Sequence, residues 1–303
     1  MNKKREEGIL NDFIIKRKAA IFSRFIAKKA AILFISLVCV FSCIPVLILA
    51  VGSVTGNYEL SVYLEGVLRG QGKTYLLLLP AFPTFQGFIE TLFYEPEFYV
   101  VFWNSVKLTA FIVAGQMFVA VPAAWGFSRC HGRLASLLFY VYTILMLLPF
   151  QVTMLSNYLV IDAIGIKDTH AAVILPAVFS TFPVFLIYRS FLGVPEEVYE
   201  AFSLESSSRL RMFYHVGVPL AMPGIKAAAL LGVIEYWNMV EQPLLFLKTP
   251  ALWPFSLYIP GISYDNISYI FVCSLIVLLP MVLIIFGGKE AVSEGIGAMA
   301  VKK

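Results

Sequence analysis

The chain has 303 residues, of which 59% are hydrophobic and only 14% are charged. Charged residues make up about a quarter of a soluble globular domain, so this composition excludes a soluble protein and indicates a chain that lies in lipid. The formal net charge of +4 comes from 23 Lys and Arg against 19 Asp and Glu. These charges are unevenly distributed along the chain, so we interpret them as an orientation signal and expect no nucleic-acid partner.

Long apolar stretches recur along the sequence, separated by charged residues. A helix needs about 20 mostly apolar residues to cross the hydrocarbon core of a bilayer. We therefore predict an all-α, polytopic membrane protein with six transmembrane helices. The expected spans, in chain order, are Ala30–Val51, Val100–Phe127, Leu134–Phe150, Ala171–Tyr188, Gly224–Val240 and Ile267–Gly287.

The segment before the first span is strongly basic. It contains Lys3, Lys4, Arg5, Lys16, Arg17, Lys18, Arg24, Lys28 and Lys29. Lys and Arg are enriched in cytoplasmic segments, so the N-terminus is predicted to be cytoplasmic, and six spans return the C-terminus to the same side. The alternative of a cleaved signal peptide is disfavoured, because the apolar run of the first span exceeds the 7–15 residues typical of such peptides.

These spans divide the chain into consecutive segments. Residues 1–29 form a cytoplasmic basic segment, 30–51 the first span, 52–99 an external segment, 100–287 the transmembrane core and 288–303 a cytoplasmic tail. Within the external segment, Tyr75–Leu79 is too short to span and is expected to pack on the outer face. Within the core, the loop 189–223 is the largest on the cytoplasmic side.

The sequence offers few residues that could form a metal site or a proton relay. The cysteines Cys39, Cys43, Cys130 and Cys273 lack the spacing of a metal site, so we expect no metal or other cofactor. Lys107, Lys226 and Glu235 fall toward span ends, which leaves the span centres without a proton relay. A transporter with this sequence would therefore take its energy from a partner chain.

The cytoplasmic loop has signals for two short helices. Pro195, Glu196 and Glu197 suit a first helical turn, so a helix is expected to continue through Leu204. The serines at 206–208 offer N-cap oxygens for a second helix, which carries Arg209–Tyr214. Gly217 and Pro219 are expected to end that helix.

This loop resembles the EAA loop of ABC-importer permeases. The matching residues are Glu200, Ala201 and Phe202, then Glu205 and Ser206, then Val218, Pro219 and Pro223. Two of them depart from the family pattern: Phe202 replaces an Ala, and Ser206 replaces a Gly that can adopt positive φ without steric cost.

Further segments are similar to the carbohydrate-uptake branch of that family. They are Asn104-Ser105, Ala123–Arg129, Pro149–Thr153, Trp237-Asn238 with Pro243-Leu244, and the Gly-rich C-terminal Gly295–Lys302. The resemblance covers roughly residue 104 to the C-terminus.

The resemblance implies the transmembrane subunit of a type I ABC importer in the inner membrane, without catalysis of its own. Its implied partners are a second homologous permease, a dimer of ATP-binding cassette ATPases and an extracytoplasmic solute-binding protein. It also implies that the helix carrying Glu200 docks on the ATPase and couples ATP binding to opening of the pore. The cargo would be a carbohydrate.

Sugars are bound by aromatic faces and by amide or hydroxyl groups. Candidates for the substrate path are Gln116, Gln151, Asn157, Tyr236, Trp237 and Asn238, although packing or interhelical hydrogen bonding is the better explanation for any one of them. Alternatives are a permease for another polar solute, such as a peptide or polyamine, and, from another class, a channel or membrane-embedded enzyme.

Overall fold

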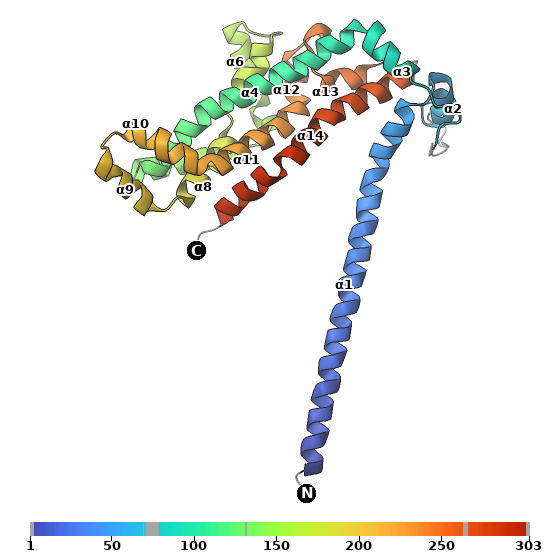
Figure 1. The fold of residues 1–303 in the computed structure, drawn as a ribbon. Helices are drawn as coiled ribbons and strands as arrows, with labels where there is room; N and C mark the ends of the chain where they lie inside the picture. Colours follow the sequence, from blue (N-terminus) through green and yellow to red (C-terminus); the bar gives the residue numbers. More distant parts are fainter. Residues whose placement is uncertain (1–2, 69, 71–78, 131, 263–265, 301–303) are drawn as a thin grey trace.

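The computed structural model describes the backbone of residues 3–68, 70, 79–130, 132–262 and 266–300. Throughout this part of the chain the structure is helical, and the one β-type contact is an isolated bridge between Thr55 and Pro83. Five helical segments are long and apolar enough to cross a membrane, and a bent helix pair raises the number to six. The predicted all-α architecture is confirmed (Figure 1).

Helix α1, Lys3–Ser53, is much longer than the expected first span. Its apolar part is Lys28–Ser53, and the basic N-terminal segment continues the same helix instead of forming a separate region. The helix touches the bundle at its C-terminal end, where Gly52 lies so close to the Phe271 ring of α14 that a Cβ would fall 2.2 Å from it. From there α1 runs away from the other helices (Figure 1).

The external segment has little regular structure beyond helices α2, Asn57–Leu68, and α3, Gln86–Ile89, which a π-helical turn follows over Glu90–Tyr94. The Glu59 carboxylate accepts a hydrogen bond from the Ala81 backbone N–H at 2.8 Å. Of the expected surface-packed stretch Tyr75–Leu79, only Leu79 lies within the described residues, and it is exposed.

Helix α4, Pro96–Arg129, has 34 residues, the same length as α14. It begins with Pro96 in the first turn, where no backbone N–H is needed. Its buried side, including Leu108 and Ile112, packs against α7, α8 and α11. At a rise of about 1.5 Å per residue, α4 extends over roughly 51 Å and thus runs the length of the bundle.

The third expected span, Leu134–Phe150, is a broken element. Helix α5, Arg133–Met146, ends before Pro149, and α6, Phe150–Ile164, leaves it at an angle of 100°. The residue before a proline is pushed out of helical conformation, which explains why the helix stops here and Phe150 starts the next one. The expected span therefore contains α5 and the break, and α6 is an additional helix.

The fourth and fifth spans were predicted at nearly the observed places. Helices α7, His170–Val178, and α8, Thr181–Gly193, together form a span of 24 residues with a short interruption. Helix α11 covers Val218–Trp237, and its Gly232 permits a close approach to α4, because a Cβ there would lie 3.2 Å from the Gln116 amide oxygen.

The last span, α14, covers Ile267–Ala300 and therefore continues through most of the expected C-terminal tail. It packs along α11, and the Trp237 indole N–H donates to the Val277 carbonyl across this contact at 3.2 Å. Between α11 and α14 lie the short helices α12, Glu241–Phe246, and α13, Phe255–Tyr258, and two 3-10 turns, Pro250–Leu252 and Ile259–Gly261.

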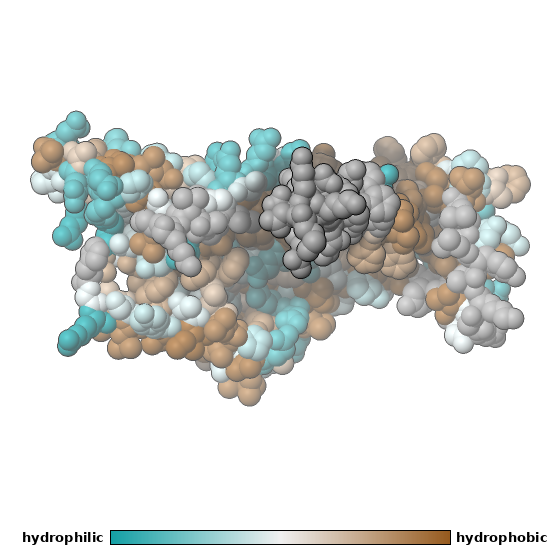
Figure 2. Space-filling view, turned by 90° about the horizontal axis from the view of Figure 1, so that it is seen from below, coloured by the Kyte–Doolittle hydropathy of each residue, from teal (hydrophilic) through white to brown (hydrophobic). Residues whose placement is uncertain are grey.

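Much of the surface of this bundle is apolar, as the brown side chains in Figure 2 show. Helices α5 and α6 alone expose Leu134, Leu137, Leu138, Val152, Leu155 and Leu159. Such surface requires lipid or another protein to cover it, which agrees with a membrane location.

Candidate coupling loop and translocation pocket

The loop that was expected on the cytoplasmic side contains helix α9, Glu196–Glu205. Pro195 precedes the helix, and Glu196 and Glu197 occupy its first turn, where carboxylates interact favourably with the helix dipole. The helix lies with α10 at the end of the bundle opposite α2 and α3 (Figure 1). The predicted helix through Leu204 is confirmed.

The turn after α9 contains the Ser206 that replaces the family Gly. Ser206 has φ −148° and ψ 125°, an extended conformation that any residue adopts without strain. Its hydroxyl accepts from the Ser208 backbone N–H, and Ser208 in turn accepts from the Arg211 backbone N–H, both at 3.4 Å. The turn therefore does not need glycine, and Ser208 caps the following helix.

The second helix of the loop does not end where we expected. Helix α10, Arg209–Met212, passes into a π-helical turn, Phe213–Gly217, and directly into α11 at Val218, so that Arg209–Trp237 forms one span. The expected stop at Gly217 and Pro219 is wrong. Pro219 directly follows the π-helical turn, and the helix continues through it without a break.

The residues matched to the EAA loop lie mainly on the outer side of the loop. Glu200, Ala201, Glu205 and Pro219 are exposed, whereas Phe202 and Ser206 are half-buried. Leu204, on α9, is 90% exposed, and Leu210, on α10, is 66% exposed. These two apolar side chains make the loop a candidate protein-binding surface.

The inner side of α9 is attached to α4 by residues that we did not predict. The Arg129 guanidinium donates to both Glu196 carboxylate oxygens at 2.7 Å and lies over the Tyr199 ring at 4.3 Å from its centroid. Tyr199 is 2% exposed, and burial raises the pKa of its phenol. Arg129 and Glu196 are 67 residues apart, so no local sequence signal connects them.

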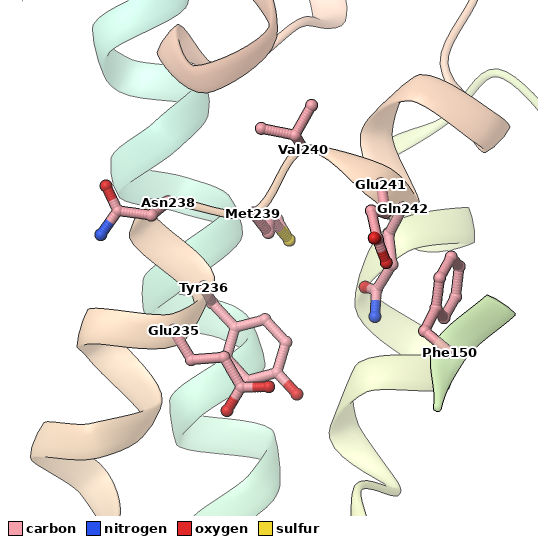
Figure 3. Close-up of a pocket in the computed structure, with 8 residues that line it drawn as sticks. All are labelled: Phe150, Glu235, Tyr236, Asn238, Met239, Val240, Glu241 and Gln242. Atoms are coloured by element: carbon pink, nitrogen blue, oxygen red, sulfur yellow. The ribbon is translucent and has the colours of Figure 1, made fainter. Parts of the chain in front are cut away.

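A pocket of about 360 Å³ opens where α11 ends and α12 begins. Figure 3 shows Glu235 and Tyr236 on the α11 side, facing Glu241, Gln242 and Phe150 across the gap. The remaining lining residues are Asn238, Met239 and Val240. The pocket thus combines two aromatic rings, two amides and two carboxylates, and none of its lining residues is basic.

Several predicted path residues meet at this pocket. Tyr236 and Asn238 line it. The Gln151 amide donates to the Glu241 carboxylate at 2.6 Å, which places Gln151 beside the lining. Gln116 is 1% exposed and donates to the Tyr236 hydroxyl at 2.9 Å and to the Ala177 carbonyl at 2.8 Å, so it supports the wall from behind.

Two other predicted path residues lie elsewhere. The Trp237 ring packs edge-on against Phe102, and its N–H bonds to α14. Asn157 lies on α6, where its amide is 3.5 Å from the Thr153 hydroxyl. Neither residue is among those that line the pocket.

The sequence analysis missed Phe150, Glu235, Glu241 and Gln242 as pocket residues. Glu235 was noted only as a charge near a span end, but in the structure it lies in a span and still faces the pocket. A carboxylate inside a membrane span is costly, so Glu235, two residues before the end of α11 at Trp237, could have been singled out as a functional candidate. Among the described residues, no group of three His, Cys, Asp or Glu side chains comes together as a metal site.

Comparison with known proteins agrees with this architecture. Residues 116–296, more than half of the chain, match the family described as "Binding-protein-dependent transport system inner membrane component". This range contains the coupling loop, α11, the pocket and most of α14.

Individual relatives are permeases of sugar transport systems. The lactose transport system permease protein LacG of Rhizobium radiobacter is 22% identical over 68% of this chain and 77% of its own length. The arabinooligosaccharides transport system permease protein AraQ of Halalkalibacterium halodurans is 24% identical over 69% of this chain and 76% of its own length.

The fold also agrees with a solved importer. One chain of a bacterial ABC transporter involved in the import of the acidic polysaccharide alginate superposes with a TM-score of 0.75 at 17% sequence identity, covering 88% of this chain and 96% of that one. The family match, together with the helical membrane architecture, shows that this chain belongs to the binding-protein-dependent transport system inner membrane components, the multi-span permease subunits of ABC importers.

Proposed function

We propose that this chain is one of two membrane-spanning permease subunits of an ATP-driven importer that translocates a carbohydrate. An extracytoplasmic binding protein delivers the sugar, and a separate pair of ATP-binding cassette ATPases supplies the energy. The chain lines half of the substrate path and transmits the conformational change of the ATPase to that path.

One observation carries this proposal: α9 protrudes at one end of the bundle and has an exposed outer face (Figure 1). Glu200 is exposed there, and Leu204 is 90% exposed beyond the apolar helices. An exposed leucine on a short, protruding helix fits the hydrophobic groove of a partner protein, with charged residues around it providing specificity. The ATPase is the partner that an importer requires at this place.

A groove-bound α9 gives a direct mechanism. When the ATPase dimer closes on ATP, the docked helix moves as a rigid body and shifts the permease between inward- and outward-facing states. The energy comes from the difference in ATP affinity between these states, so this chain needs no catalytic group.

The apolar surface supports a second permease as partner. The apolar part of α1 has no buried share in its most hydrophobic window, and it extends away from the bundle. Glu235, Asn238 and Glu241 are exposed in the single chain although they line the pocket. A second permease on that face would close the pocket into a path between the two subunits.

The pocket supports a carbohydrate as cargo. The rings of Phe150 and Tyr236 suit the apolar faces of a sugar, and the amide of Gln242 and the carboxylate of Glu241 suit its hydroxyl groups. The Gln242 amide oxygen is buried and has no hydrogen-bond partner within the described residues. The names of LacG and AraQ point to the same class of solute.

Copurification and uptake test the proposal together. The tagged chain, expressed with its neighbouring genes and purified in mild detergent, is expected to retain a second permease and two ATPase subunits. Vesicles that contain this complex should take up a radiolabelled oligosaccharide only with the binding protein outside and ATP inside. Uptake that continues without ATP would contradict the proposal in favour of a channel or secondary carrier.

A further inference from the structure

Arg129 forms a paired, charge-assisted contact between the coupling loop and the transmembrane helices. It is the last residue of α4, and both of its terminal nitrogens donate at 2.7 Å to the two carboxylate oxygens of Glu196 in the first turn of α9. Paired N–H···O bonds of this kind fix the relative orientation of the two groups as well as their distance.

Aromatic rings hold the guanidinium in place. It lies 4.3 Å from the centroid of Tyr199 and 5.8 Å from that of Trp125. Cation–π contacts and the partial burial of the Arg129 side chain, 26% exposed, distinguish this pair from an ordinary surface ion pair, which contributes little.

Trp125 extends the attachment to the rest of the loop. Its ring centroid lies 5.3 Å from that of Phe191 in α8, 5.6 Å from that of Tyr199 in α9 and 5.6 Å from that of Phe213 in the π-helical turn. A Cβ on Gly217 would lie 2.6 Å from the same ring. The C-terminal part of α4 therefore contacts the helices on both sides of α9 as well as α9 itself.

The same helix reaches the pocket. Gln116 precedes Arg129 by 13 positions on α4, which corresponds to about 20 Å along the helix axis. Gln116 donates to the hydroxyl of Tyr236 in the pocket wall, and α4 stays helical through Pro122 between the two residues. One continuous element thus connects the coupling loop with the pocket.

We propose that Arg129 is a positioning residue that clamps α9 to α4 through Glu196 and Tyr199, so that a displacement of the coupling helix moves α4 and with it the Gln116–Tyr236 wall of the pocket. This inference rests on the proposed function and adds the route by which the ATPase signal reaches the path.

The test measures pocket accessibility and does not require knowledge of the sugar. Asn238, a pocket residue, is replaced as Asn238→Cys in a chain whose four native cysteines are changed to alanine. The whole complex is reconstituted, and the rate of modification by a membrane-impermeant maleimide is compared with and without ATP plus vanadate. An intact clamp should give a rate ratio of about ten between the two conditions.

The clamp variants should lose this response. Arg129→Glu and Glu196→Arg are each expected to bring the ratio close to one in assembled complexes, and the double exchange should restore at least half of the response. Restoration by exchanged charges is a result that a merely structural role of either residue does not produce. Arg133→Glu, an exposed arginine at the start of α5, is the matched control and should keep the full ratio.

Other outcomes overturn the clamp. A full ratio in either single variant, or an assembled double exchange without restoration, would show that α9 moves α4 by another route. If Arg129→Glu prevents assembly, Arg129→Lys replaces it as the test variant. Lysine keeps the charge but cannot form the paired hydrogen bonds, so a reduced rate ratio is expected. An unchanged rate ratio in Arg129→Lys would refute the proposal. Absence of any ATP response in the parent complex would instead count against the proposed function.

Discussion

The side-chain amide of Gln116 donates to the hydroxyl of Tyr236 at 2.9 Å, and this buried bond joins α4 to the wall of the pocket. Gln116 is 1% exposed, and the same nitrogen also donates to the Ala177 carbonyl of α7. Three helices therefore meet at one amide.

Removal of this amide should destabilise the chain and disturb the pocket. Gln116→Leu leaves the Tyr236 hydroxyl without its donor, and a lost buried partner costs about 1–3 kcal/mol. Tyr236→Phe should cost about 1 kcal/mol, and the double variant should cost less than the sum because both changes remove the same bond. Thermal unfolding of the purified complex checks this, and strictly additive effects would show that the bond contributes nothing.

The second prediction concerns Glu200 on the coupling helix. Glu200→Ala should leave folding largely intact, because the side chain is exposed in a loop outside the spans. A misaligned coupling helix should weaken uptake and substrate-stimulated ATP hydrolysis by about tenfold, equivalent to about 1.4 kcal/mol of coupling. Rates are measured in vesicles at matched expression.

Ser206→Gly is the control in the same loop. Ser206 already has an extended backbone, so glycine should be tolerated. Unchanged uptake in the Glu200 variant would show that the loop only connects two helices.

The third prediction concerns substrate affinity in the pocket. Glu241→Ala removes a carboxylate from the lining together with the 2.6 Å contact to Gln151. One charge-assisted hydrogen bond to a sugar hydroxyl corresponds to about a tenfold change in affinity, so the KM for uptake should rise by about that factor with little change in maximal rate.

Glu90→Ala provides the comparison for Glu241→Ala. Glu90 accepts from the Gln86 amide at 2.7 Å, the same kind of contact, but it lies on the external segment away from the pocket. Its KM should stay at the parent value. Equal effects of the two changes would exclude a direct role of Glu241 in binding.

The fourth prediction is a pH dependence at Asp168. Its carboxylate accepts from the Thr249 hydroxyl at 2.6 Å and from the Thr249 and Lys248 backbone N–H groups, and these bonds lower the pKa of Asp168. Because the folded pKa lies below the unfolded one, the stabilisation is present above the ordinary Asp pKa of about 4 and is lost as the pH falls through the folded value.

Asp168→Asn should therefore lower the unfolding temperature at pH 7, and this effect should shrink as the pH falls below about 4. Asparagine tolerates the left-handed conformation of this residue, φ 57°, so the difference reports on the charge and not on the backbone. Unfolding is followed by tryptophan fluorescence between pH 3 and pH 7. A destabilisation that does not vary with pH would contradict the interpretation.

The fifth prediction concerns orientation. The basic N-terminal segment places both termini in the cytoplasm if six spans are present. Reporter fusions at Ser207 and Arg133 should therefore report a cytoplasmic position, and a fusion at Asp168 an external one. An external Ser207 would refute docking of α9 on a cytoplasmic ATPase.

The sequence alone was sufficient for the properties that depend on local composition. Apolar length determines where a helix can cross lipid, so the helical class and the places of most spans were predictable from residue 30 onward. Pro195, Glu196 and Glu197 likewise predicted the start of α9, because the first turn of a helix favours these residue types wherever it occurs.

Tertiary structure decided everything that depends on residues far apart in the chain. Pro149 breaks the third span at 100°, whereas the helix continues through Pro219 directly after a π-helical turn, so the effect of a proline depends on the backbone around it. The contacts of Arg129 with Glu196 and of Gln151 with Glu241 join residues 67 and 90 positions apart. Only helix packing brings such groups within bonding distance, and the periodicity of one helix carries no information about which face of another it will meet.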